Sequence, residues 1–177
     1  MSTKLKSSRN TYTIIVDNLR LRYRVKNGSV NAINGISFKI KPGEVLGIVG
    51  ESGCGKTSIA LSLIKLLPKN VSRFSGQISL QGKQVKKISE KLFRKQIRWK
   101  KISMVFQGAM NSLDPVFTIK QQFDELLNQH GFSSNADKII RDAIHAVNLD
   151  YSILDKYPHE LSGGMKQRIV IAMALLL

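Results

Sequence analysis

The first forty residues alternate between apolar and polar positions in two segments. Residues 11–24 alternate and are rich in β-branched and aromatic side chains, and residues 31–40 place an apolar residue at positions 33, 36, 38 and 40. A period of two is typical of strands that bury one face. The intervening Lys-Asn-Gly-Ser at 26–29 favours a turn. We therefore predict two strands joined by a turn.

Three shorter segments extend the predicted sheet. Residues 45–49 and 102–106 are short, almost wholly apolar runs next to turn residues, which is the pattern of a strand buried on both faces. Residues 75–80 form a shorter strand, closed by Gln81 and Gly82. We expect 45–49 and 102–106 to be buried strands.

A helical pattern dominates the second half of the chain. A capping box formed by Ser134 and Asp137 predicts the start of one of these helices. The predicted helices cover residues 58–67, 89–99, 119–129, 134–147 and 165–177, with a short turn or helix at 152–157. Strands followed by a mainly helical stretch indicate an α/β core with a helical insertion that starts near Gly108.

Composition narrows the class of protein. The 177 residues are 42% hydrophobic and 23% charged, which is ordinary for one globular domain or a fragment of a larger one. The N-terminus is polar and basic, and the longest apolar run, residues 169–177, is far shorter than the about 20 residues that span a bilayer. We expect a cytosolic or membrane-peripheral protein. The single cysteine, Cys54, excludes an internal disulfide, and the histidines have no metal-site spacing.

The chain carries a formal net charge of +16, and nine of its 28 Lys and Arg residues lie between positions 83 and 101. Only Glu90 opposes them there. The predicted helix 89–99 places Lys91, Arg94 and Arg98 on one face. A solvated basic face is the simplest interpretation. An anionic membrane surface or nucleic acid is the alternative, and the charge alone does not decide between them.

Residues 50–57, Gly-Glu-Ser-Gly-Cys-Gly-Lys-Thr, fit the phosphate-loop pattern G-x-x-x-x-G-K-[ST]. Glycines let successive backbone N–H groups point at one anion, Lys56 supplies a charge for the terminal phosphates, and the Thr57 hydroxyl suits Mg²⁺. A glycine-rich turn that binds nothing is disfavoured, because an apolar run precedes the motif and a predicted helix follows it. We also consider that alkylation of the Cys54 thiol would block nucleotide binding.

A second glycine turn, Leu-Ser-Gly-Gly-Met-Lys-Gln-Arg at residues 161–168, opens the last predicted helix. Its hydroxyl and N–H groups suit a second phosphate contact. At this distance from a phosphate loop, it resembles the signature motif of ATP-binding cassette (ABC) proteins. A small-molecule kinase with a phosphate loop would have no use for this motif.

The resemblance covers essentially the whole chain and implies its architecture. The implied fold is α/β: a P-loop NTPase ABC core with an N-terminal antiparallel β subdomain and a helical subdomain. The chain would be a single, incomplete nucleotide-binding domain, since the family's next element, an apolar strand ending in Asp-Glu, does not occur before Leu177. Residues 1–107 would form the β subdomain and phosphate-loop core, 108–164 the helical subdomain with the signature motif, and 165–177 a helix returning to the core.

The resemblance also implies ATP and Mg²⁺ as cofactors and assigns site residues. Lys56 and Gln107 would act in catalysis, and Thr57 and Gln107 would serve the metal. Tyr23 would stack on adenine, although a core tyrosine on an edge strand is the alternative, and Gln107 could be an ordinary surface glutamine. The expected nucleotide contacts are Tyr23, Gly50, Glu51, Ser52, Gly53, Cys54, Gly55, Lys56, Thr57, Ser58 and Gln107, joined from a second subunit by Ser162, Gly163, Gly164 and Gln167.

Within the family, residues 106–115 and 157–161 resemble the ATPase subunits of dipeptide, oligopeptide and nickel importers; Gly108, where an acidic residue is usual, departs from that pattern. The branch implies a peripheral subunit on the cytoplasmic face of the membrane. Its implied partners are a second ATPase subunit in a head-to-tail dimer, membrane permease subunits and, indirectly, a substrate-binding protein.

Two other functions remain open. One is an ABC ATPase that acts on nucleic acid or the ribosome, for which the net charge argues, although no insertion typical of such proteins is present. The other is a remnant that binds nucleotide without catalysis. Because residues 1–177 lack the Asp-Glu strand and the switch histidine of the family, we expect them to bind ATP but not to hydrolyse it at a normal rate by themselves.

Overall fold

The computed structural model describes residues 12–132 and 135–177. The chain forms two compact units, one ending at Arg98 and the other starting at Trp99. The predicted subdomain limits at residues 107 and 164 stay predictions. Ser134, the first residue of the predicted capping box, lies outside the described residues.

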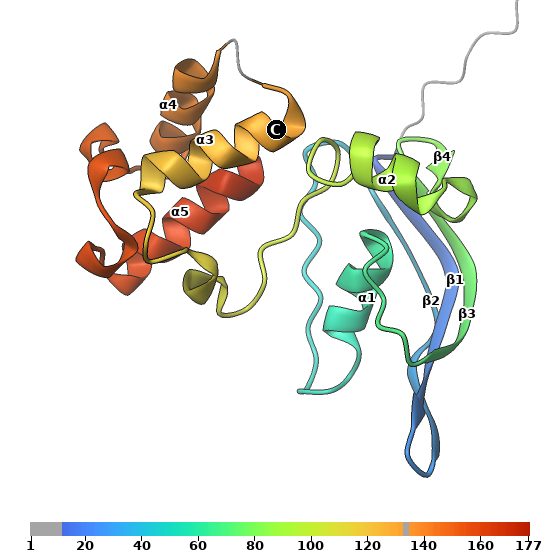
Figure 1. Ribbon diagram of the computed structural model, residues 1–177. Coiled ribbons are helices and arrows are strands. Elements are labelled where there is room, and N and C mark those ends of the chain that lie inside the picture. Colours follow the sequence, from blue (N-terminus) through green and yellow to red (C-terminus); the bar gives the residue numbers. More distant parts are fainter. Residues whose placement is uncertain (1–11, 133–134) are drawn as a thin grey trace, which may run out of the picture. The chain divides into compact units, whose positions relative to one another are not determined.

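The first unit contains a four-stranded antiparallel sheet (Figure 1). The strand order is β2-β1-β3-β4, so that β1 lies between β2 and β3. This confirms the strands expected over residues 11–24, 31–40 and 75–80 and the turn at Gln81 and Gly82. The strands are β1 (Ile14–Val25), β2 (Gly28–Ile40), β3 (Val71–Leu80) and β4 (Lys83–Gln84).

Two helices pack in the first unit: α1 (Lys56–Leu63) and α2 (Glu90–Gln96). α1 lies beside the sheet in Figure 1 and is shorter than the helix predicted over residues 58–67. The fully buried side chains include Leu19 and Leu21 of β1 and Phe93 of α2. Val16 of β1 is buried as well, and a register shift between Val16 and Leu19 offsets the period of two that the sequence predicts.

The prediction of buried strands at residues 45–49 and 102–106 is wrong for this structure. Neither segment forms a strand, apart from a single bridge at Ile102. Val45 and Val49 are 94% and 96% exposed, and Phe106 is 48% exposed. An inner strand depends on hydrogen-bonded neighbours and on cover for both faces. The described part of the chain places no such neighbour beside these two segments.

The basic helix is also shorter than predicted. α2 ends at Gln96, and Trp99 adopts a φ of 73°, so Arg98 does not share a helical face with Lys91 and Arg94. Instead, the Arg98 guanidinium donates to the Ile64 backbone oxygen at 3.0 Å and pairs with Glu90 at 2.8 Å. Arg98 therefore satisfies a carbonyl at the C-terminal end of α1.

The second unit is helical, with α3 (Ile119–His130), α4 (Ala136–Ala146) and α5 (Gly163–Leu175) around one apolar core. Phe123, Ile140 and Ile169 are among its fully buried residues. A capping box formed by Thr118 and Gln121 starts α3. The predicted helices are confirmed here, with α5 starting two residues earlier than expected.

The connection between α4 and α5 consists of two short 3₁₀ helices, Tyr151–Asp155 and Pro158–Glu160. This agrees with the short turn or helix expected at residues 152–157. No helix in the described part of the chain is both long and apolar enough to cross a bilayer.

Candidate functional site

The phosphate loop runs from residue 50 to the start of α1, and two of its glycines have left-handed backbone angles. Gly53 has a φ of 82° and Gly55 a φ of 97°, which side chains rarely allow. A Cβ atom on Gly55 would also overlap the backbone oxygen of Ala32 in β2, whereas Gly53 faces open space. Gly55 therefore lets α1 start directly against the sheet.

The N-terminus of α1 has no side-chain cap. Gly55 occupies the capping position, and the first turn contains no acidic residue. By contrast, Thr118 caps α3 and Ser162 caps α5. The first N–H groups of a helix have no acceptor within it, so those of α1 are available to an external anion at the positive end of the helix dipole.

The Lys56 ammonium group is held at the loop. Its Nζ donates to the backbone oxygens of Gly50 and Glu51, at 2.7 and 2.6 Å, and lies 3.5 Å from the Cys54 Sγ. These contacts keep a full positive charge beside the free N–H groups of α1. An ammonium group and several N–H groups that converge on one open loop suit the phosphates of a nucleotide.

The loop is open to a ligand. Glu51, Ser52, Cys54 and Thr57 are exposed. Thr57 follows Lys56 directly and is exposed, and its hydroxyl group would be one ligand for a metal ion. The described residues contain no cluster of His, Cys, Asp or Glu side chains that could hold a metal by itself. The hydroxyl group of Thr57 would therefore be the contribution of this loop to a metal ion.

Tyr23 lies next to the loop. Its hydroxyl group is 3.1 Å from the Ser58 Oγ, in the first turn of α1, and its side chain is half-buried. β1 is flanked by β2 and β3, so the alternative of a tyrosine on an edge strand is wrong in that detail. The hydrogen bond places the phenol ring beside the phosphate loop, and the stacking on adenine stays a prediction.

The second unit contains Gln107 and the signature motif. Gln107 is exposed, in a turn that Gly108 continues with a φ of 75°. Ser162 caps α5 through its Oγ, which accepts from the Met165 N–H at 3.3 Å. Gly163 and Gly164 are exposed in the first turn, and Gln167 is exposed one turn later. The N–H groups of Gly163 and Gly164 at this helix start are therefore open to an anion.

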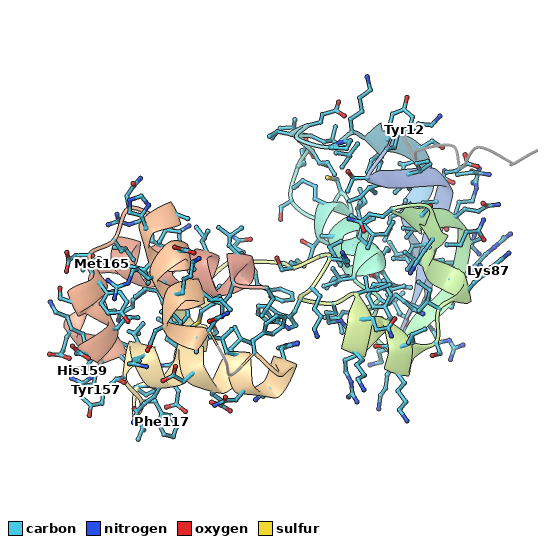
Figure 2. The ribbon with its side chains drawn as sticks, turned by 90° about the horizontal axis from the view of Figure 1, so that it is seen from above. Tyr12, Lys87, Phe117, Tyr157, His159 and Met165 are labelled. Atoms are coloured by element: carbon cyan, nitrogen blue, oxygen red, sulfur yellow. The ribbon has the colours of Figure 1, made fainter. Side chains whose placement is uncertain are left out.

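His159 packs against its neighbour. Its ring stacks on that of Tyr157, with centroids 5.6 Å apart and an interplanar angle of 16° (Figure 2). The Tyr157 N–H donates to the Glu160 carboxylate at 2.6 Å and so fixes the turn before the signature motif. His159 and Tyr157 are both exposed, so the stack is a surface contact, and it supports a structural role for His159.

One group of basic residues in the sheet was not predicted from the sequence. Arg20, Arg22 and Arg24 alternate along β1, and Arg73 lies opposite Arg22 on β3. The alternation was visible in the sequence, but the partner on β3 required the register of the sheet.

Comparison with known proteins identifies the family. A family model described as "ABC transporter" matches residues 33–177. The "Probable peptide ABC transporter ATP-binding protein" y4tR of Sinorhizobium fredii is 40% identical over 166 residues, which cover 90% of this chain and 49% of that protein. The dipeptide transport ATP-binding protein DppD of Caldanaerobacter subterraneus is 40% identical over 168 residues, which cover 93% of this chain and 51% of that protein. The chain spans about half the length of these relatives.

Solved structures agree on the fold. An ATP-binding cassette in a dimeric, post-hydrolysis state bound to ADP and Pi has a TM-score of 0.76 at 24% identity, with 92% of this chain and 69% of that chain covered. The cbiO1 protein of Clostridium perfringens, part of the ABC transporter complex cbiONQ, has a TM-score of 0.68 at 25% identity. The match covers 94% of this chain and 62% of that chain. The first of these likenesses supports the fold alone. The match over residues 33–177, which includes both glycine motifs, shows that the chain belongs to the ABC transporter family.

Proposed function

We propose that the chain is the ATP-binding part of an energy-coupling subunit of an ABC importer for dipeptides or oligopeptides. The observation that carries the proposal is the start of α1, where an uncapped helix, a left-handed glycine and the Lys56 ammonium group converge on one open loop. The peptide class rests on the names of the relatives, which describe peptide and dipeptide transport. Nickel is the second candidate substrate, from the same branch of the family.

The site residues of the first unit each have a proposed task toward the nucleotide. Lys56 and the N–H groups at the start of α1 bind and orient the terminal phosphates. Thr57 offers its hydroxyl to Mg²⁺, and Tyr23 offers its ring to the base. Bound ATP with Mg²⁺ supplies the phosphoryl group and the charge neutralisation for hydrolysis.

We further propose that the signature motif serves a nucleotide on a second subunit. Ser162 already uses its side chain to cap α5, so the N–H groups of Gly163 and Gly164 are the main donors for an incoming phosphate. Gln167 lies one turn further along the same helix. A head-to-tail dimer would place each signature motif against the phosphate loop of the other copy. Gln107 would contribute to the metal and to the attacking water.

Hydrolysis is a separate matter from binding. Residues 1–177 contain no apolar strand that ends in Asp-Glu, the element that positions Mg²⁺ and water in the family. We propose that these residues alone bind ATP without sustained turnover. The proposed location is the cytoplasmic face of the membrane, in contact with permease subunits and indirectly with a substrate-binding protein.

A nucleotide-binding titration tests the proposal. Binding of a fluorescent ATP analogue with Mg²⁺ should weaken at least about tenfold in Lys56→Ala, because two or more charge-assisted contacts are lost. Lys69→Ala, which removes an exposed lysine after α1, is the matched control and should bind normally. Equal binding by Lys56→Ala and the unchanged chain would refute the nucleotide site.

The net charge of +16 favours one competing function, action on nucleic acid. Fluorescence anisotropy with duplex RNA distinguishes action on nucleic acid from the proposed role in peptide import. We expect weak binding that disappears at physiological salt. RNA binding that persists at that salt, together with failure to associate with peptide permease subunits, would favour the competing function.

A further inference from the structure

The exposed face of the antiparallel sheet holds a group of arginines that the nucleotide site does not use. Arg20 and Arg22 of β1 and Arg73 of β3 line a hollow of about 60 Å³, together with Asn31 and Asn34 of β2. Tyr23, the next residue of β1, donates to Ser58 of α1 instead, so these arginines lie on the face opposite to α1.

Two arginines face each other across the sheet without a carboxylate between them. Arg22 and Arg73 are direct cross-strand partners, an arrangement that normally destabilises a sheet. None of the ion pairs found among the described residues involves Arg20, Arg22 or Arg73. The residues outside the description, 1–11 and 133–134, contain no Asp or Glu that could neutralise them.

Asparagine side chains hold the first two guanidinium groups in place. Arg22 Nε donates to the Asn31 Oδ1 at 2.7 Å, and Arg20 Nη1 donates to the Asn34 Oδ1 at 2.7 Å. Each asparagine is the cross-strand partner of the arginine that it contacts. Because these acceptors are neutral amides, they orient the guanidinium groups and leave the positive charge uncompensated.

Gly35 provides room for the Arg20 guanidinium. Gly35 has a φ of 80°, and a Cβ atom there would lie 2.9 Å from Arg20 Nη2. Arg20 Nε also donates to the Asn18 Oδ1 at 3.3 Å, at a point where the register of β1 shifts. Bulges of this kind redirect side chains and commonly adjoin functional sites. Nη2 of Arg20, both Nη atoms of Arg22 and the whole Arg73 guanidinium have no acceptor among the described residues.

The hollow fits a compact anion. A single water molecule needs about 10–15 Å³ of such volume, so the 60 Å³ of this hollow admits a group larger than one water, such as a phosphate group. Guanidinium groups bind phosphate oxygens through paired N–H donors. We propose that Arg20, Arg22 and Arg73 form a second phosphate-binding site, separate from the phosphate loop. Its ligand is the phosphate group of a small soluble phosphate or of a lipid headgroup.

The site is tested in a Lys56→Ala background, so that the phosphate loop contributes little. Inorganic phosphate should shift the side-chain Nε–Hε NMR signals of Arg22 and Arg73, and Arg22→Gln/Arg73→Gln should bind phosphate at least about tenfold more weakly by calorimetry. The charge-matched control Arg24→Gln/Lys26→Gln removes two exposed cations outside the hollow and should change binding less than about twofold.

Two further titrations distinguish a small soluble phosphate from a lipid headgroup. One uses glycerol 3-phosphate, and the other uses phosphatidylcholine vesicles that contain or lack phosphatidic acid. Binding that depends on Arg22 and Arg73 in either titration supports the site and names its source. If inorganic phosphate leaves both arginine signals unmoved, or if the control variant weakens binding as much as Arg22→Gln/Arg73→Gln, the proposal is overturned. Circular dichroism verifies the fold of each variant. The outcome is independent of nucleotide binding at the phosphate loop.

Discussion

At the scale of single residues, the two left-handed glycines of the phosphate loop have different reasons to be glycine. Gly53 needs only its backbone angle, because the space around it is open. Gly55 needs both its angle and its lack of a side chain, because the Ala32 carbonyl of β2 lies against it. Two glycines of one motif therefore differ in what a substitution would cost.

Gly53→Ala should lower the free energy of unfolding by about 1–2 kcal/mol, the cost of a left-handed alanine. Gly55→Ala should cost more, by about a further 1–3 kcal/mol, because α1 must move away from β2. Urea denaturation measures both values. Equal losses in the two variants would show that the approach of α1 to β2 is not tight.

The cross-strand pair Arg22 and Arg73 gives a second prediction at this scale. In buffer without phosphate at low salt, Arg73→Gln should raise the free energy of unfolding by about 0.2–1 kcal/mol, because it removes a like-charge contact. The gain should shrink at 1 M salt, where the Debye length is about 3 Å. Arg24 lies two residues after Arg22 in β1 and pairs with Ser29 of β2. Arg24→Gln should therefore show no comparable gain in stability. A loss of stability in Arg73→Gln would contradict this account.

At the scale of elements, the sequence predicted those whose stabilising contacts are local or lie nearby in the chain. The alternating strands of the antiparallel sheet and the helices of the second unit were found because one face of each meets a core within its own unit. Residues 45–49 and 102–106 were misassigned because their pattern assumes strand neighbours that the described residues do not provide. A periodic pattern indicates which face of a segment should be buried. Whether that face is buried depends on the neighbouring elements.

Some features of the candidate site could likewise be predicted from the sequence, and others could not. The phosphate loop and the signature motif were readable because glycines, lysine and serine at fixed spacing have few other uses. The hydrogen bond from Tyr23 to Ser58 was not readable, because it depends on how α1 packs against β1. The arginine pair across β1 and β3 was not readable either, because it depends on strand register. Bulges in β1 shift that register at several points, and sequence spacing does not locate them.

The start of α5 allows its capping role to be separated from its proposed role toward a nucleotide. Ser162→Ala should lower the free energy of unfolding by about 0.5–2 kcal/mol, because the Met165 N–H loses its acceptor. Ser162→Asp keeps a capping oxygen and should fold as well as the unchanged chain, but its charge should repel a phosphate. Nucleotide-dependent dimerisation, followed by light scattering, should therefore fail in Ser162→Asp. Normal dimerisation of that variant would argue against the proposed contact.

His130, at the C-terminal end of α3, should make the free energy of unfolding depend on pH. Burial, and then the nearby Lys100 ammonium group, lower the pKa of His130, whose ring lies 6.2 Å from that of Trp99. With the folded pKa below the unfolded value of about 6.5, the unfolded chain binds more protons in this range. Stability should therefore fall as the pH drops from about 6.5 through the lowered pKa. His130→Gln should flatten the profile of the free energy of unfolding measured by denaturation between pH 7 and pH 5. A profile that keeps its slope in this variant would contradict this account.

At the scale of the whole molecule, the segment before the phosphate loop combines two exposed valines with a backbone that lacks strand partners. Val45 and Val49 are almost fully exposed, and no described strand pairs with them. Exposed apolar side chains on backbone without hydrogen-bonded partners promote association between copies. The 177-residue chain should therefore self-associate as its concentration rises and should bind an apolar dye.

Val45→Thr/Val49→Thr should reduce both effects, because each substitution keeps the shape of the side chain and adds a hydroxyl group. Val30→Thr is the matched control: Val30 is 53% exposed but lies in β2, paired with Tyr23. Sedimentation velocity over a range of concentrations measures the association. A chain that stays monomeric at all concentrations, or a control that reduces association as much as the double variant, would show that the exposed segment is not an adhesive edge. Retained ATP binding in the double variant would show that the adhesive and nucleotide-binding properties of this neighbourhood are separable, although Val49 directly precedes the phosphate loop.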